Sequence, residues 1–249
     1  MKKTLLGLAL AAGLSIVAVP AISSFAEDKP AAGAAAEGAK APEGFESLFS
    51  GKDLTGWKGR EDLWKVEDGA ITGDAKADPG YNTFLVWQGG DVADFELHFK
   101  YRIHSGNSGV QYRSKVTDAE KFKVGGYQGD FEHGTTFSGI LYDEGGVAGN
   151  RGVMAQRGEK VTWPKTGDKK VEKLGMTTEE LQKAIKQGDW NDYVIIAKGN
   201  HLTHKINGNT TVEVIDESDK ALKSGVLAIQ LHAGGPMKVQ VKDIHLKKM

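Results

Sequence analysis

The stretch Phe95-Glu-Leu-His-Phe-Lys-Tyr-Arg-Ile103 alternates strictly between apolar and polar residues. Side chains of a β-strand point alternately to the two faces of a sheet, so the pattern predicts a strand with one face in a core and one toward solvent. Similar runs recur along the chain, separated by turn signals drawn from its 33 glycines. They cover residues 64–67, 84–87, 109–114, 127–132, 139–142, 193–198, 202–207, 211–215, 225–232 and 238–246.

Only one segment has helical spacing. Thr177-Thr-Glu-Glu180 is a capping box, apolar residues follow it at helical intervals, and Gly188 ends the pattern. This short helix lies in a lysine-rich insertion, residues 159–188, which we expect either to cover a binding groove as a lid or to decorate its rim. Many short strands, one helix and no β-α-β alternation predict an all-β antiparallel sandwich.

The first 26 residues have a basic start, an apolar stretch and the small residues Ser24 and Ala26, which is the pattern of a signal peptide. Residues 27–43 form an Ala/Gly/Pro-rich segment that is too polar to bury a core, so we expect a flexible linker. The folded domain is predicted at residues 44–249. We therefore expect an exported protein, periplasmic or extracellular, with no membrane anchor after cleavage.

Composition excludes several classes of function. The chain has no cysteine, so it has no disulfide, no thiolate metal site and no thiol nucleophile. Its formal net charge is −1 and it has no basic run, which argues against a nucleic-acid partner. We expect a monomer that acts on a small molecule or an oligosaccharide.

Polar residues in the three runs 105–114, 126–132 and 139–144 are the strongest indication of function. They include Gln, Arg, Asp, Glu and Tyr, whereas an ordinary solvated face carries Lys, Glu and Thr. With the run 225–232, they would share one face if the four strands are neighbours in one sheet. Such a face predicts a groove for a polyol, because carboxamides offer paired donors and acceptors to hydroxyl groups. The predicted set is Gln111, Arg113, Gln128, Asp130, Glu132, Tyr142, Glu144, Gln230 and His232.

Two arginines have alternative roles that the sequence leaves open. Arg113 either contacts the substrate or forms an ordinary cross-strand ion pair with Asp130 or Glu132. Arg151, in a loop at the expected edge of the groove, either clamps a substrate oxygen or pairs with Asp143 or the adjacent glutamate.

A divalent metal is a further alternative for the same face. Asp130, Glu132 and His232 are suitable ligand types, but no ligand-spacing motif accompanies them. We therefore predict no metal site and no cofactor.

The three polar runs resemble a known family when they are taken with the opening segment 45–57, the segment 190–193, the turn 206–208 and the run 225–232. The chain is similar, over about residues 44–247, to the bacterial 3-keto-disaccharide hydrolase domain family. This resemblance implies a concanavalin A-like jelly-roll sandwich. It also implies a glycoside-cleaving enzyme that acts on sugars already oxidised to a ketone at carbon 3.

That chemistry suits the residues of the predicted groove. A ketone at C3 makes the C2 proton acidic, so a general base removes it, the glycosidic oxygen leaves, and water adds back. As a hypothesis, Asp130 or His232 is the base and Arg113 stabilises the enolate. Glu132 or Glu144 then protonates the leaving group. The remaining polar residues, Gln111, Gln128, Gln230 and Tyr142, orient the sugar.

The same residues also bear on two other functions. Retaining glucanases of this fold carry Glu-x-Asp-x-Glu on one strand, but here Gln128 replaces the first glutamate, so the nucleophile is missing. A non-catalytic carbohydrate-binding module needs exposed aromatic platforms more than converging acids. The predicted groove has more acids than exposed aromatics, which favours an enzyme.

Overall fold

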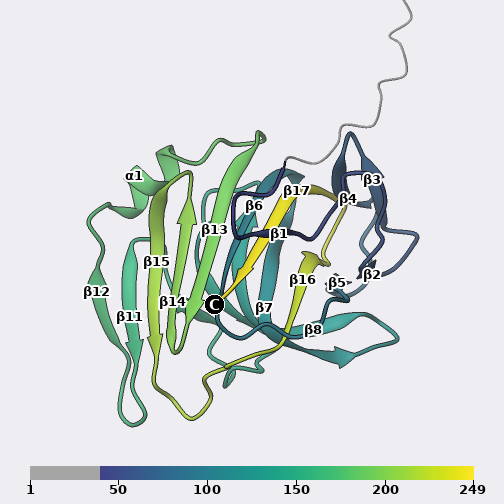
Figure 1. Cartoon of the computed structure of the whole chain (residues 1–249). Helices are drawn as coiled ribbons and strands as arrows, with labels where there is room; N and C mark the ends of the chain where they lie inside the picture. Colours follow the sequence, from purple (N-terminus) through teal and green to yellow (C-terminus); the bar gives the residue numbers. More distant parts are fainter. Residues whose placement is uncertain (1–39) are drawn as a thin grey trace, which may run out of the picture. The chain divides into compact units, whose positions relative to one another are not determined.

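The computed structural model of the chain describes residues 40–249. The predicted signal peptide and most of the predicted linker lie outside the described residues. Within the part that is described, two sheets contain almost all the regular structure, as Figure 1 shows. The predicted all-β sandwich is therefore confirmed.

The first sheet has ten strands in the described part of the chain. In spatial order they are β12 (Lys170–Lys173), β11 (Glu159–Trp163), β15 (Asn209–Asp216), β14 (His201–Ile206), β13 (Asn191–Lys198), β6 (Phe95–Ser105), β17 (Met237–Lys248), β4 (Ala70–Ala75) and β3 (Trp64–Glu67), with β1 (Glu46–Ser47) paired to β17. All pairings are antiparallel except that of β11 with β15, which is parallel.

The second sheet has seven strands in the same part of the chain and is antiparallel throughout. Its spatial order is β10 (Val153–Ala155), β9 (Leu141–Glu144), β8 (Lys123–Glu132), β7 (Asn107–Asp118), β16 (Val226–Leu231), β5 (Thr83–Trp87) and β2 (Trp57–Lys58). This sheet holds all four of the runs that the sequence marked as polar.

The core lies between the sheets. Strand β6 buries its odd-numbered residues from Phe95 to Ile103, as the alternation predicted. From the facing strand β8, Phe131 packs against Tyr101, with ring centroids 4.3 Å apart, and against Phe99 at 6.2 Å. Burial of this apolar surface is the main force that holds the two sheets together.

Local signals also match the structure. The helix α1 (Thr178–Lys183) has the predicted capping box, in which the Glu180 amide donates to Oγ1 of Thr177 at 3.2 Å and the Thr177 amide donates to Oε2 of Glu180 at 2.9 Å. Asn207 and Gly208 both have positive φ, 50° and 82°, as a two-residue hairpin turn requires. Strands β1, β2, β4 and β10–β12 are not among the predicted runs. In residues 40–249, no helix has the length and hydropathy of a membrane span.

Candidate functional site

The four strands with polar runs are neighbours in the order β9, β8, β7, β16. Tyr142 pairs with Gln128, Gln128 pairs with Gln111, and Gln111 pairs with Ala228 across the sheet. The condition on which the predicted groove depended is therefore met.

A cavity of about 370 Å³ lies over this part of the sheet. We call it the acidic cavity. Its volume falls in the range of small-molecule sites, ~300–1,000 Å³. Its lining includes six residues that the sequence predicted and four that it did not. The predicted ones are Gln128, Asp130, Glu132, Tyr142, Glu144 and His232; the others are Asn82, Asn107, Phe137 and Gly145.

Asp130 is the most perturbed acid of this cavity. Its side chain is only 5% exposed and accepts a hydrogen bond from Nε2 of Gln128 at 2.5 Å. Burial raises the pKa of Asp130 to about 8, with smaller contributions from the charges of Glu144 and Glu132, although hydrogen bonds from Gln128 and Asn107 oppose the shift. A carboxyl group whose pKa lies near neutrality, in a cavity, is suited to proton transfer.

The three predicted glutamines form a hydrogen-bonded group beneath Asp130. Ser114 donates from Oγ to Oε1 of Gln111 at 2.7 Å, Gln111 donates to Oε1 of Gln128, and Gln128 also contacts Oε1 of Gln230 at 3.3 Å. Gln111 and Gln230 are fully buried and do not line the cavity. The sequence predicted that both contact the sugar, but the structure buries them outside the cavity lining, where they hold Gln128 in place.

Gly109 leaves room for that arrangement. A Cβ atom at this position would lie 2.6 Å from Cγ of Gln128 and 2.9 Å from its Nε2. Any other residue would therefore push Gln128 away from Asp130.

The two glutamates of the cavity have different partners. Oε1 of Glu132 accepts hydrogen bonds from the backbone amides of Thr136 and Phe137, the latter at 2.8 Å. Oε1 of Glu144 accepts from Nδ2 of Asn82 at 2.9 Å. Glu132 thus fixes a loop through one carboxylate oxygen, while Glu144 is held through one oxygen by a side-chain amide.

Asn82 connects Glu144 to the segment that carries His232. Its Oδ1 accepts the backbone amide of Ala233 at 2.9 Å, and Asp78 accepts the next amide, that of Gly234, at 3.0 Å. His232 lines the cavity and is exposed. Asn107 lies four residues before Gln111 and so on the same face of the strand, so the alternation could have predicted it. Asn82 and Phe137 lie in loops, where no periodicity indicates a role.

Arg113 does not belong to this site. It is 1% exposed, has a φ of 49°, and points into the opposite side of the sheet, where it donates to the backbone oxygens of Ala93 (2.6 Å), Gly199 (2.6 Å) and Leu222 (3.3 Å) and to Asp94 (2.8 Å). The predicted contact of Arg113 with the enolate is therefore wrong. The alternative ion pair with Asp130 or Glu132 of β8 is wrong as well. The cause is a bulge in β7, where the register with β8 shifts between Tyr112 and Lys115.

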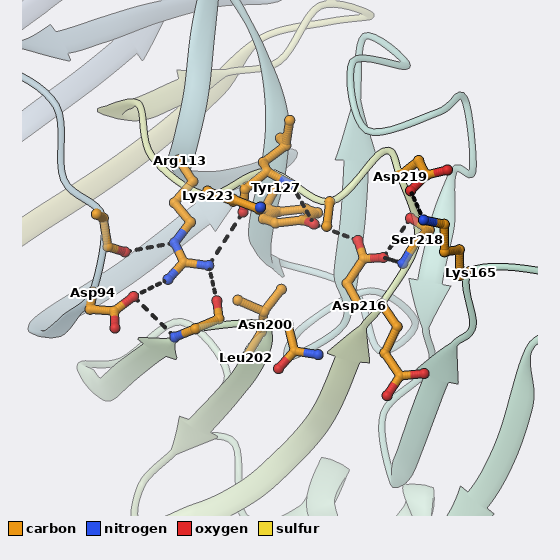
Figure 2. Close-up of a pocket in the computed structure, with 15 residues that line it drawn as sticks. Asp94, Arg113, Tyr127, Lys165, Asn200, Leu202, Asp216, Ser218, Asp219 and Lys223 are labelled. Atoms are coloured by element: carbon orange, nitrogen blue, oxygen red, sulfur yellow. Dashed lines mark hydrogen bonds and ion pairs between the residues drawn. The ribbon is translucent and has the colours of Figure 1, made fainter.

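Arg113 instead borders a second cavity, of about 1,010 Å³, drawn in Figure 2. Tyr127 and Asp216 also line this larger cavity, and they are joined to each other by a hydrogen bond. The two cavities share no lining residue. We favour the smaller one as the functional site, because the buried charges of the larger one are neutralised by protein partners.

Arg151 is likewise committed elsewhere. Its guanidinium pairs with Asp216 at 2.6 Å and lies over the ring of Trp163, 4.8 Å from the centroid. The predicted contact with Asp143 exists only through the Arg151 backbone amide, at 2.9 Å. Arg151 is therefore not a lining residue of the acidic cavity.

The acidic cavity contains side chains of the types that bind metals, but these side chains are not grouped as metal ligands. Among residues 40–249, no three His, Asp or Glu side chains are grouped so that they would hold a metal ion. The alternative set of Asp130, Glu132 and His232 lines one cavity without forming such a group.

Comparison with known protein families shows the family of this chain. The model of the 3-keto-alpha-glucoside-1,2-lyase-like domain matches residues 44–247. The chain belongs to this family. Membership in the 3-keto-alpha-glucoside-1,2-lyase-like family supports a function related to carbohydrates.

Solved structures show the fold of this lyase-like domain. A protein from Parabacteroides distasonis, proposed to be a glycosyl hydrolase, has 16% identity and a TM-score of 0.54, with 82% of this chain and 99% of that chain covered. A Bacillus subtilis protein with a galectin-like fold has 10% identity and a TM-score of 0.54, covering 82% and 94%.

The endo-β-1,3(4)-glucanase SCLam has 12% identity and a TM-score of 0.50, covering 88% and 98%. These similarities confirm the concanavalin A-like jelly-roll sandwich. A search of curated proteins finds no match.

Proposed function

We propose that this chain cleaves glycosides that carry a ketone at carbon 3, by removing the C2 proton and expelling the oxygen on C1. The observation that carries the proposal is the buried carboxyl of Asp130, with its pKa near 8, in a cavity that also presents Glu144 and His232. The family to which the chain belongs supports the same class of substrate.

In the proposed reaction, the Asp130 carboxylate takes the C2 proton, and the electrons of that C–H bond pass into the ketone to form an enolate. The enolate then re-forms the ketone, a C1–C2 double bond forms, and the C1–O bond breaks. The released oxygen takes a proton and leaves as an alcohol. No oxidant or reductant is consumed, and later addition of water across the double bond gives net hydrolysis.

The other cavity residues supply the remaining roles. Asn107 and Tyr142 line the cavity and replace Arg113 as the candidates that donate to the enolate oxygen. Glu144 and His232 are the candidates that protonate the leaving oxygen. Glu132 is less suited to this role, because its Oε1 already accepts two backbone amides.

The test is a mass-spectrometric assay of the protein without residues 1–26, with a 3-keto disaccharide and its unoxidised parent sugar. We expect cleavage of the keto sugar alone, deuterium at C2 of the hydrated product in D₂O, and loss of turnover in Asp130→Asn. A parallel assay with a chelator tests the absence of a metal requirement. Cleavage of the unoxidised sugar, or full activity of Asp130→Asn, would refute the proposal.

A carbohydrate-binding module is the second candidate, and one observation favours it. Phe137, at the rim of the cavity, is an exposed aromatic ring, which sugar-binding modules use as a platform. If the module is correct, no keto sugar is cleaved, and glycan affinity survives neutralisation of both Asp130 and Glu144.

We also propose that the protein is exported, which the pattern of residues 1–26 supports.

A further inference from the structure

We propose that Phe137 binds the leaving-group ring, so that the preferred substrates are glycosides whose leaving group is itself a ring, such as a second sugar. This inference rests on the proposed function, because it places the oxidised sugar in the acidic cavity beside Asp130.

Phe137 stands out by its exposure. It is 41% exposed, and no other Phe, Tyr or Trp side chain among residues 40–249 is as open to solvent. It also lines the same cavity as Asp130 and Glu144. A single exposed ring is ordinary on a protein surface. What distinguishes Phe137 is its place, because it borders the cavity that holds the acids, where an aromatic face is open to a sugar ring.

The loop that carries Phe137 is fixed from several sides. Glu132 accepts the amides of Thr136 and Phe137, and the buried guanidinium of Arg157 donates to the oxygens of Ser138 (2.7 Å) and Thr135 (2.9 Å). These bonds tie the backbone on both sides of the ring. The backbone that carries the ring is therefore held in place, which lowers the entropy lost when a ligand binds there.

The insertion supports this loop from outside the cavity. Thr178, the first residue of α1, donates from Oγ1 to the backbone oxygen of Arg157 at 2.8 Å, and its own backbone oxygen accepts from Nε of Arg157 at 3.3 Å. Gln187, just after the helix, donates to the oxygen of Gly134 at 3.0 Å. The insertion thus supports the loop that carries Phe137.

The chemistry of the cavity decides which ring lies on Phe137. The oxidised ring must contact Asp130 at C2 and hydrogen-bond donors at its ketone, and those groups belong to the polar lining. The platform that remains, Phe137, is apolar and suits the C–H face of the ring on the other side of the glycosidic bond. A small leaving group such as methanol would not reach it.

The test compares two substrates, a 3-keto disaccharide and the methyl glycoside of the same 3-keto sugar, in Phe137→Ala and Phe137→Trp. For the disaccharide we expect Phe137→Ala to raise KM about tenfold (~1.4 kcal/mol) with kcat within threefold, and Phe137→Trp to restore it. For the methyl glycoside we expect no change. Val171→Ala, which truncates an exposed apolar side chain on β12, is the control and should resemble the parent.

Equal effects on the two substrates, or no effect on either, would overturn the inference. If the parent cleaves neither keto sugar, the proposed function fails separately, and calorimetric titration with the unoxidised disaccharide and monosaccharide replaces the assay. A loss of disaccharide affinity alone in Phe137→Ala would then support the platform, and unchanged affinity would refute it.

Discussion

Gln128 donates a hydrogen bond to Oδ1 of Asp130, two residues further along the same strand, at 2.5 Å. Residues two apart share one face of a strand, so this contact follows from the alternation of β8. The bond favours the ionised carboxylate, yet burial outweighs it and the pKa of Asp130 still rises to about 8. Two opposing effects, burial and this hydrogen bond, therefore set the pKa of Asp130 near neutral pH.

The first prediction concerns the pH dependence of turnover. If ionised Asp130 is the base, kcat/KM for a 3-keto glycoside rises with pH and levels off above about pH 8. Gln128→Met removes a hydrogen bond that lowers the pKa, so this limb should move to higher pH. A pH–rate profile that instead falls through pH 8 would make Asp130 an acid.

The second prediction concerns stability. Because the folded-state pKa of Asp130 is raised, the native protein keeps a proton that the unfolded chain loses near pH 4. The contribution of this protonated carboxyl to the free energy of unfolding is complete below pH 4 and is lost as pH rises through about 8. Asp130→Asn should therefore gain stability relative to the parent over this window, by at most ~1.4 kcal/mol per pH unit. Urea unfolding at pH 4, 6 and 8 measures the difference, and the exposed Asp91→Asn is the control. A difference that is constant with pH would contradict the shift.

The third prediction separates Arg113 from catalysis. Arg113→Lys cannot satisfy the oxygens of Ala93, Gly199 and Leu222 together, so we expect a loss of ~2–4 kcal/mol in the free energy of unfolding. At a temperature where the variant is folded, kcat/KM should stay within twofold of the parent. Denaturant unfolding and initial rates measure the two effects, and a large fall in kcat without a stability loss would return Arg113 to the site.

The fourth prediction concerns Asn82 as a positioning residue. Asn82→Ala frees Glu144 and the amide of Ala233, so we expect kcat/KM to fall about tenfold, which corresponds to ~1.4 kcal/mol, mostly in kcat. Thermal unfolding should change little. Asn200→Ala is the matched control, because Asn200 lines the larger cavity. If Asn200→Ala impairs turnover and Asn82→Ala does not, the functional site has been assigned to the wrong cavity.

Alternation was sufficient to predict most of the sheet positions of the site. Side chains with the parity of Gln128, Asp130 and Glu132 do lie together, since β8 keeps one regular register with β9. The same rule failed at Arg113, where a bulge turned the side chain to the other face.

The signal for that bulge was present in the neighbouring strands. Gly225, just before β16, and Gly126, on β8, both lie against Ser114. A Cβ atom added to Gly225 would lie 2.2 Å from the backbone oxygen of Ser114, and one added to Gly126 would lie 2.4 Å from its Oγ. Two glycines that allow such close approach to one residue indicate an irregular backbone, but their alignment across strands is visible only in three dimensions. The loop residues Asn82 and Phe137 depend on the same kind of tertiary information.

The position of β17 has a consequence for biosynthesis. This last strand lies between β6 and β4, with Val241 paired to Tyr101 on one side and to Ile71 on the other. Strands made early therefore remain without their partner until the ribosome has delivered residues 237–248. Long-range pairing of this kind slows folding, and this sheet is completed only when the last strand has been made.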